Sequence, residues 1–144
     1  MKTLTKKSLD ELAKTMSVIS ESDLVNFGGG GGTTMKFNNQ QELYSYLNDI
    51  LMIQCVEVSF VIYYNGTCAV YVDDTNTSTS STITLWGSAS TGYYFPSGGA
   101  GAVSEWGHTH PSGIHTPSQA DYDAKNKYAG LPASIYTFGG AHPY

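Results

Sequence analysis

The sequence contains no arginine, and only 13% of its residues are charged. All seven basic residues are lysines, and the formal net charge is -5. Lysines are also scarce beyond residue 14, so the rest of the chain is distinctly acidic. Binding to phosphate backbones requires clustered Lys and Arg. The composition therefore argues against nucleic acid as a partner.

Long apolar runs are also lacking. A helix that crosses a bilayer needs about 20 consecutive apolar residues, and no stretch approaches that length. The N-terminal region has no short apolar core followed by a small-residue cleavage site, so it is not an ordinary secretory signal. We therefore expect no membrane span.

Cysteine is nearly absent as well, with only Cys55 and Cys68. They fall on neighbouring predicted strands joined by an Asn65-Gly66 turn, which would place Cys68 opposite Tyr63 rather than Cys55. The expectation is two buried free thiols. Export to an oxidising compartment would allow a disulfide, and the sequence does not decide between the two states.

The first 30 residues differ from the rest. A capping box at Ser8–Glu11 opens an amphipathic helical pattern, and five glycines follow at positions 28–32. This arrangement resembles a double-glycine leader, which a peptidase fused to an export transporter removes. Cleavage after Gly30 would put the four apolar positions of that pattern at Met16, Ile19, Leu24 and Phe27.

The leader resemblance implies a transporter as a partner and a secreted or periplasmic location after leader removal. A plain amphipathic helix with a flexible linker would satisfy the same residues, and the protein would then stay in the cytoplasm. Residues 1–30 are thus expected to be a leader-like segment, with the linker at 28–32, and residues 33–144 to be the folded domain.

Residues 33–144 predict an α+β fold. Asn38 or Asn39 caps a helix with one apolar face, and a polar helix opens at Ser118. Strands are expected at 56–64, 67–73, 82–86, 102–109 and 134–138. Asn65-Gly66 indicates a type I′ turn. Helices would therefore flank a mainly antiparallel or mixed sheet.

The candidate chemistry lies between Glu105 and Asp121. His108 and His110 are two residues apart, so on a strand both imidazoles point to the same side. Ser118 and Asp121 are three apart and share a face of the first helical turn. Two imidazoles and one carboxylate are a usual ligand set for catalytic zinc, which keeps a fourth position for water.

Each half of this pattern has a simpler explanation. Ser-x-x-Asp before a helix is most often an N-terminal cap, and His-x-His on a strand is usually a pair of surface residues. Their occurrence together, joined by Pro111, is a less common coincidence. The composite therefore favours a metal site.

At these residues the chain resembles the JAB1/MPN metalloproteases, whose JAMM motif is His-x-His-Pro, a spacer, Ser-x-x-Asp and a Glu on an earlier strand. The resemblance implies a cytidine-deaminase-like layout and a catalytic Zn²⁺ held by His108, His110 and Asp121. It also implies that Ser118 donates a hydrogen bond to the oxyanion of the tetrahedral intermediate.

The resemblance further requires a Glu as general base and acid, and Glu57 is the best match. The family usually has glycine three residues later, where this chain has Phe60. An outward-facing strand residue is the simpler interpretation of Glu57. Glu42 and Glu105 are rival candidates, although Glu105 is three residues from His108 and would project to the opposite strand face.

The function implied is a zinc-dependent metallopeptidase or isopeptidase that hydrolyses an amide bond of a peptide or protein. The alternative is a catalytically inactive MPN-type module that is secreted and acts by binding or as an effector. His115, in the loop between the ligands, is expected to be an exposed loop residue.

Overall fold

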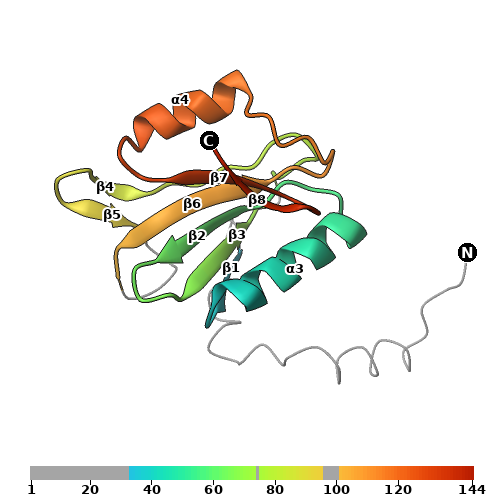
Figure 1. The fold of residues 1–144 in the computed structure, drawn as a ribbon, viewed down its shortest axis with the longest axis horizontal. Coiled ribbons are helices and arrows are strands. Elements are labelled where there is room, and N and C mark those ends of the chain that lie inside the picture. The colour runs from blue at the N-terminus through green and yellow to red at the C-terminus, as the bar shows by residue number, and fades with distance from the viewer. Residues whose placement is uncertain (1–32, 74, 96–100) are drawn as a thin grey trace, which may run out of the picture. The chain divides into compact units, whose positions relative to one another are not determined.

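The computed structural model describes residues 33–73, 75–95 and 101–144. The leader prediction for residues 1–30 lies outside this part of the chain. The described residues form two helices and a mixed sheet of eight strands, most of whose pairings are antiparallel (Figure 1). The α+β prediction with a mixed sheet is thus confirmed.

The helices are α3 (Gln40–Ile53) and α4 (Gln119–Lys127). The strands in chain order are β1 (Thr33–Phe37), β2 (Ser59–Tyr63), β3 (Cys68–Val72), β4 (Trp86–Ser88), β5 (Gly92–Tyr94), β6 (Val103–Thr109), β7 (Ala133–Thr137) and β8 (Gly140–Pro143).

The sheet follows the order β1-β3-β2-β6-β5-β4, and β7 pairs with both β6 and β8. Among the described strands only β6 and β7 pair in parallel, and α4 lies in the connection between them. A parallel pair needs such a crossover because a tight turn cannot join two strands of the same direction. The crossover brings α4 close to the end of β6.

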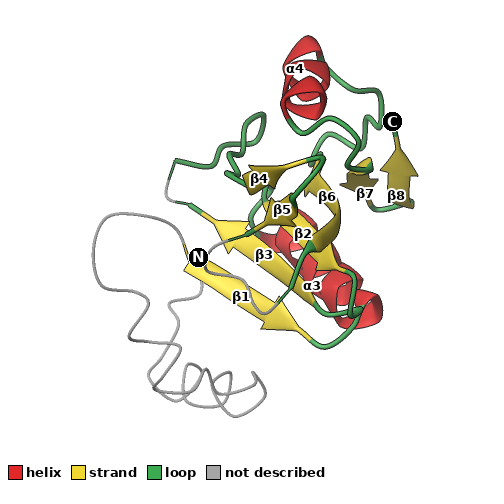
Figure 2. Cartoon of the chain, turned by 90° about the vertical axis from the view of Figure 1, so that its left-hand side faces the viewer, coloured by secondary structure: helices red, strands yellow, loops and turns green. Residues whose placement is uncertain are grey.

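Helix α3 covers one face of the sheet (Figure 2). Asn39 caps it by accepting from the Glu42 backbone N–H, which confirms one of the two caps expected from the sequence. Its buried side chains are the apolar face that the sequence predicted: Leu43, Leu47, Ile50 and Leu51. They pack against alternate residues of β2, including Phe60 and Ile62.

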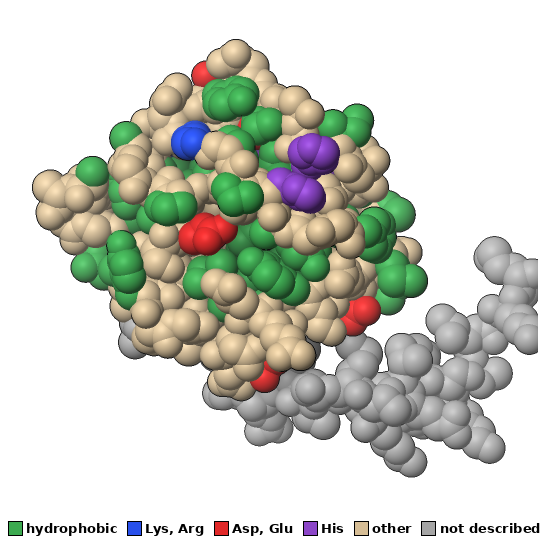
Figure 3. All heavy atoms as spheres, viewed as in Figure 1, with side chains coloured by type: hydrophobic (Ala, Val, Ile, Leu, Met, Phe, Trp, Pro, Cys, Tyr) green, Lys and Arg blue, Asp and Glu red, His purple; other side chains and the backbone are tan. Residues whose placement is uncertain are grey.

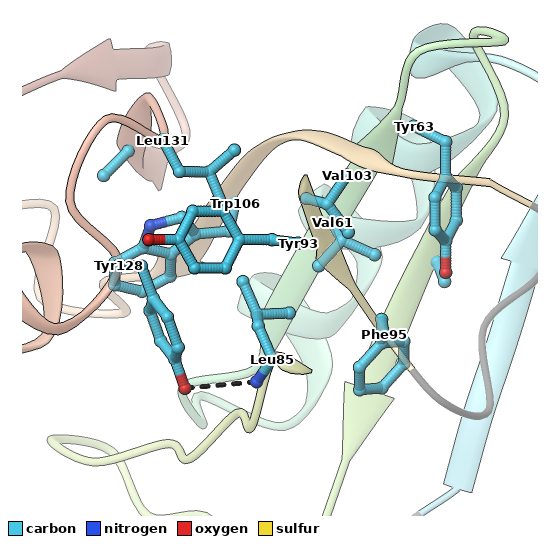
Figure 4. Close-up of a cluster of buried hydrophobic side chains, with 11 residues drawn as sticks. Val61, Tyr63, Leu85, Tyr93, Phe95, Val103, Trp106, Tyr128 and Leu131 are labelled. Carbon is cyan, nitrogen blue, oxygen red and sulfur yellow. Dashed lines mark hydrogen bonds between the residues drawn. The ribbon is translucent and has the colours of Figure 1, made fainter. Parts of the chain in front are cut away.

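The opposite face of the sheet carries a second core (Figure 4). Val61 of β2 and Trp106 of β6 meet Tyr128 and Leu131, which follow α4. The Tyr128 hydroxyl accepts from the Leu85 backbone N–H at 3.1 Å and lies 3.2 Å from a second backbone partner, the Ile83 carbonyl, to which it donates. This hydroxyl fixes the segment before β4 to the end of α4.

Several details differ from the sequence prediction. The turn after β2 is not type I′, because among the described residues only Gly66 of the pair has a positive φ, at 86°. The Gly66 N–H donates to the Tyr63 carbonyl, and the Tyr63 N–H donates to Thr67. This three-residue turn ends in a left-handed glycine and shifts the register, so Cys68 lies opposite Ile62 instead of Tyr63.

The strand expected at 82–86 is also wrong for most of its length, because β4 begins only at Trp86. Strands β1, β5 and β8 were not predicted.

Both cysteines are free, and Cys68 is buried as expected, but Cys55 is exposed. Its expected burial is wrong because the residue follows the C-terminal end of α3 in a left-handed conformation with φ 51°.

Charged side chains are sparse on the face drawn in Figure 3, where hydrophobic and neutral polar groups dominate. Within the described residues, no helix combines the length and the apolar character that crossing a membrane would need.

Candidate metal centre

Strand β6 presents both histidines on the face opposite α3. His108 lies across from Ser59 of β2, on the same side of the strand as Trp106. His110 follows one residue after the strand ends and keeps the same side. Their Nε2 atoms are 3.0 Å apart, so the two rings converge on one point. The shared side predicted from the His-x-His spacing is therefore present.

The orientation of His110 is fixed by the loop that follows it. Its Nδ1 lies 2.6 Å from the Ile114 carbonyl oxygen, which can only accept, so Nδ1 carries the proton. The lone pair of Nε2 is then free to face His108. Metal-binding histidines commonly donate their other ring nitrogen to a carbonyl or carboxylate in this way.

His108 is held by aromatic packing. It is 4% exposed, and its ring stacks on Trp106 with centroids 6.4 Å apart. The Tyr144 ring meets it edge-on, also at 6.4 Å. These contacts limit the rotation of the imidazole and exclude solvent from one side of the cluster.

The start of α4 supplies the carboxylate. Ser118 is the N-cap, and it forms a capping box with Asp121: the Ser118 hydroxyl accepts from the Asp121 N–H, and the Asp121 carboxylate accepts from the Ser118 N–H at 2.6 Å. The capping interpretation of Ser-x-x-Asp is thus correct, and it coexists with a place in the cluster.

The Asp121 carboxylate reaches both histidines. Its Oδ1 is 3.1 Å from His108 Nε2, and its Oδ2 is 3.8 Å from His110 Nε2. Burial alone would raise the pKa of Asp121, but hydrogen bonds from His108 and Ser118 outweigh burial and hold the pKa well below its usual range. Asp121 is therefore an ionised carboxylate aimed at the two imidazoles.

Glu57 lies just before β2 and is only 8% exposed. Its Oε1 is 3.7 Å from His110 Nε2. Burial raises the pKa of Glu57 to about 7, with the nearby Asp121 charge adding to the rise and His108 opposing it. A carboxyl group with a pKa near neutrality can both accept and return a proton at physiological pH.

Thr109 connects the backbone around Glu57 to the histidine strand. Its hydroxyl accepts from the Val58 N–H at 3.0 Å and donates to the Val56 carbonyl at 3.3 Å. Its backbone N–H also donates to the Val58 carbonyl. The residue between the two histidines thus positions the residues on either side of Glu57.

Four separations within the cluster are close to those between the ligands of a tetrahedral metal site. With ligand bonds of about 2.1 Å, tetrahedral ligand atoms lie about 3.4 Å apart. The separations here of 3.0, 3.1, 3.7 and 3.8 Å lie on both sides of that value. Glu57, His108 and His110 offer ligand atoms that are all within 4.8 Å of one another and could hold a metal ion. Asp121 is the fourth member, so either carboxylate could complete the set.

The rival acids lie elsewhere. The Glu42 carboxylate accepts from the Asn38 N–H at the start of α3. Glu105 lies opposite Ile62 and accepts from Ser134, on the face covered by α3. Its projection away from His108 was predicted. His115 is exposed, as expected, and stacks on His142 with centroids 4.6 Å apart.

A cleft of about 430 Å³ opens beside the cluster. Glu57, both histidines, Ser118 and Asp121 all line it. A further wall of the cleft is formed by residues 78–83, which are attached to the sheet by a 2.9 Å hydrogen bond between Ser81 and Ser59. Five of its six residues are Ser or Thr, so this wall offers many hydroxyl groups and no charge.

The sequence alone does not indicate Thr109, Ser59 or the hydroxyl wall as parts of the site. The burial of Thr109 could have been inferred from its position between two histidines, since it must face the other side of the strand. The wall had no such signal, because its place depends on Tyr128 and on the Ser59–Ser81 contact.

No family model, curated protein or solved structure matches the chain. The function must therefore be argued from the geometry of the cluster and its cleft.

Proposed function

We propose that this protein is a zinc-dependent hydrolase of amide bonds, a metallopeptidase or isopeptidase in which His108, His110 and Asp121 hold the ion. The observation that carries the proposal is the convergence of both Nε2 atoms with the Asp121 carboxylate beside a buried Glu57 in an open cleft. The resemblance of these residues to the JAMM motif supports the same assignment.

A zinc ion held there would polarise the substrate carbonyl and bring the pKa of a water molecule toward neutrality. Glu57 would take the proton from that water and later hand it to the leaving amine. Its pKa of about 7 suits both steps, because the group can exist in either form at neutral pH.

The role of Ser118 in the reaction is narrower than the oxyanion contact that the JAMM motif implies. Its hydroxyl proton is donated to Asp121 Oδ2 at 2.8 Å. A hydroxyl has one proton, so it must turn away from Asp121 before it can stabilise an oxyanion. We therefore assign Ser118 first to the orientation of Asp121, and the oxyanion role requires that rotation.

The zinc content of the purified full chain tests the site. Mass spectrometry should find about one zinc per wild-type chain and a loss of zinc in His110→Ala. His115→Ala is the matched control, because it removes a histidine outside the cluster and should keep the metal. A wild type that takes up no metal, or a His110→Ala variant that retains it, would contradict the site.

Hydrolysis of a pool of N-acetylated hexapeptides then tests the chemistry. Cleavage that is lost both with a chelator and in Glu57→Gln supports a peptidase. Zinc binding without cleavage of any peptide or isopeptide would instead favour the secreted binding or effector module.

A further inference from the structure

The cleft beside the metal cluster has an uneven distribution of charge. Of its twenty lining residues only three are charged: Glu57, Asp121 and Lys127. The two acids belong to the cluster, so Lys127 is the one charged group left to recognise a substrate within the lining of this cleft.

Lys127 belongs to the stripe of α4 that faces the cleft. The helix lines the cleft with Ala120, Asp121, Ala124 and Lys127, and Tyr128 follows at its C-cap. At 100° per residue these positions fall within an arc of about 120°, with Asp121 and Lys127 toward its two edges. The alanines between them leave room for a ligand to lie along the helix.

The ammonium group of Lys127 has no carboxylate partner among the described residues, where its contact is the Tyr128 ring, 5.2 Å from Nζ to the centroid. Lys125, two residues earlier, is engaged differently: its Nζ donates to the Tyr144 carbonyl and lies 5.3 Å from the centroid of that ring. A cation that packs along an aromatic ring and lacks an anion is ready to accept an anionic group from outside.

The spacing along the helix sets the size of the ligand. Asp121 and Lys127 are six residues apart, which is about 9 Å along an α-helix. An extended peptide advances about 3.3–3.6 Å per residue, so 9 Å corresponds to two or three residues. A peptide with its scissile carbonyl at the cluster would reach Lys127 with its C-terminal carboxylate.

We propose that Lys127 binds the C-terminal carboxylate of a peptide substrate, so that the enzyme releases a segment of two or three residues from a free C-terminus. This inference rests on the proposed function. In the reaction, water adds its hydroxyl to the scissile carbonyl carbon, the C–N bond breaks and a proton goes to the leaving amine. The products are a shortened peptide with a new carboxylate and a di- or tripeptide with a free amine.

Cleavage specificity gives the first test. Zinc-loaded full chain should cut N-acetylated hexapeptides two or three residues from a free C-terminus. Amidation of that terminus should raise KM about tenfold with little change in kcat, the effect expected for one lost charge-assisted hydrogen bond. Lys127→Met should raise KM for the free acid to a similar degree and leave the amide unaffected. Lys36→Met removes the same charge from an exposed position of β1, outside the cleft lining, and is the matched control.

Binding gives a test that needs no turnover. In the zinc-loaded Glu57→Gln protein, NMR titration should show N-acetyl-trialanine binding about tenfold more tightly than its amide, and Lys127→Met should remove that difference. Equal affinity for acid and amide, or no binding of either, would overturn the inference. Cleavage of internal bonds, whether or not the C-terminus is amidated, would support the proposed hydrolase and overturn the role of Lys127 in binding the C-terminal carboxylate. Tighter binding of the free acid than of the amide through Lys127, without any hydrolysis, would support the carboxylate-binding site and contradict the proposed hydrolase.

Discussion

Phe60 and Gly107 lie directly opposite one another on β2 and β6, and the Phe60 ring fills the space that a side chain at Gly107 would need. A Cβ built on Gly107 would lie 2.4 Å from Phe60 Cζ and 2.4 Å from the Ser134 carbonyl oxygen. The packing of this pair affects the candidate metal site, because Gly107 directly precedes His108. The large residue where JAMM proteins usually have glycine is thus accommodated by a glycine on the neighbouring strand.

Gly107→Ala should lower the free energy of unfolding by about 3 kcal/mol, because an overpacked site forces the surrounding backbone to move. Urea titration would measure the change. Gly139→Ala is the control, since its added Cβ would meet its nearest neighbours at ordinary contact distances of 3.7 Å or more and should change stability by less than about 1 kcal/mol. Equal stability of the two variants would show that Phe60 and the Ser134 carbonyl leave more room than their positions indicate.

The identity of the carboxylate ligand can be determined by comparing Glu57→Gln with Asp121→Asn. If His108, His110 and Asp121 hold the ion, Glu57→Gln should keep zinc affinity within about tenfold and lose hydrolysis, while Asp121→Asn should lose the metal. Competition with a chromophoric chelator measures both affinities. The reverse pattern would make Glu57 the ligand. Glu105→Gln, on the opposite face of the sheet, should change neither property.

Glu57 should also make the metal-free protein less stable at alkaline pH. Below pH 4.5, its ordinary pKa, the carboxyl is protonated in both the folded and the unfolded chain. As the pH rises to about 7 the unfolded chain releases this proton and the folded chain retains it, so the free energy of unfolding falls. The total loss above pH 7 is about 3 kcal/mol.

Urea unfolding at pH 4.5 and pH 8, with a chelator present, would show this dependence as a difference between wild type and Glu57→Gln. The variant cannot ionise, so it should gain stability relative to wild type as the pH rises. A wild-type-minus-variant difference that stays constant between the two pH values would contradict the raised pKa.

Thr109→Val removes a hydroxyl without changing the size of the side chain. The Val58 N–H would lose a partner in a buried position and the Val56 carbonyl in a partly buried one, which costs about 1–3 kcal/mol for a buried group left unsatisfied. We expect kcat to fall at least tenfold while zinc binding persists, because Glu57 is displaced and the ligands are not. Thr109→Ser should restore most of the activity. A Ser variant as impaired as Val would indicate that the methyl group, not the hydroxyl, positions the segment.

The parts of the site that the sequence could predict are those governed by local periodicity. Alternation along β6 put His108 and His110 on one side, and the capping pattern of α4 put Asp121 beside Ser118. Both depend on residues close together in the chain. Their convergence on one point depends on the β6–α4–β7 crossover, which the spacing alone does not specify.

Other features depend on contacts between distant segments. Residues 83–85 alternate like a strand in sequence, yet the Tyr128 hydroxyl bonds to two of their backbone groups, and they form no strand there. Strands β1, β5 and β8 are short and carry glycine or polar residues, so their pairing depends on neighbours that local pattern does not reveal. Glu57 was placed within a strand but lies before it, where Thr109 holds its neighbours.

The two sides of this site differ in how far apart their residues lie in the chain. Residues 108–121 contain both histidines and Asp121, so one short stretch of chain holds the three proposed ligands. Glu57 joins only when β2 has paired with β6, a contact between segments some fifty positions apart. In the proposed hydrolase, replacing Glu57 alone would leave His108, His110 and Asp121 in place and give a metal-binding protein that cannot hydrolyse.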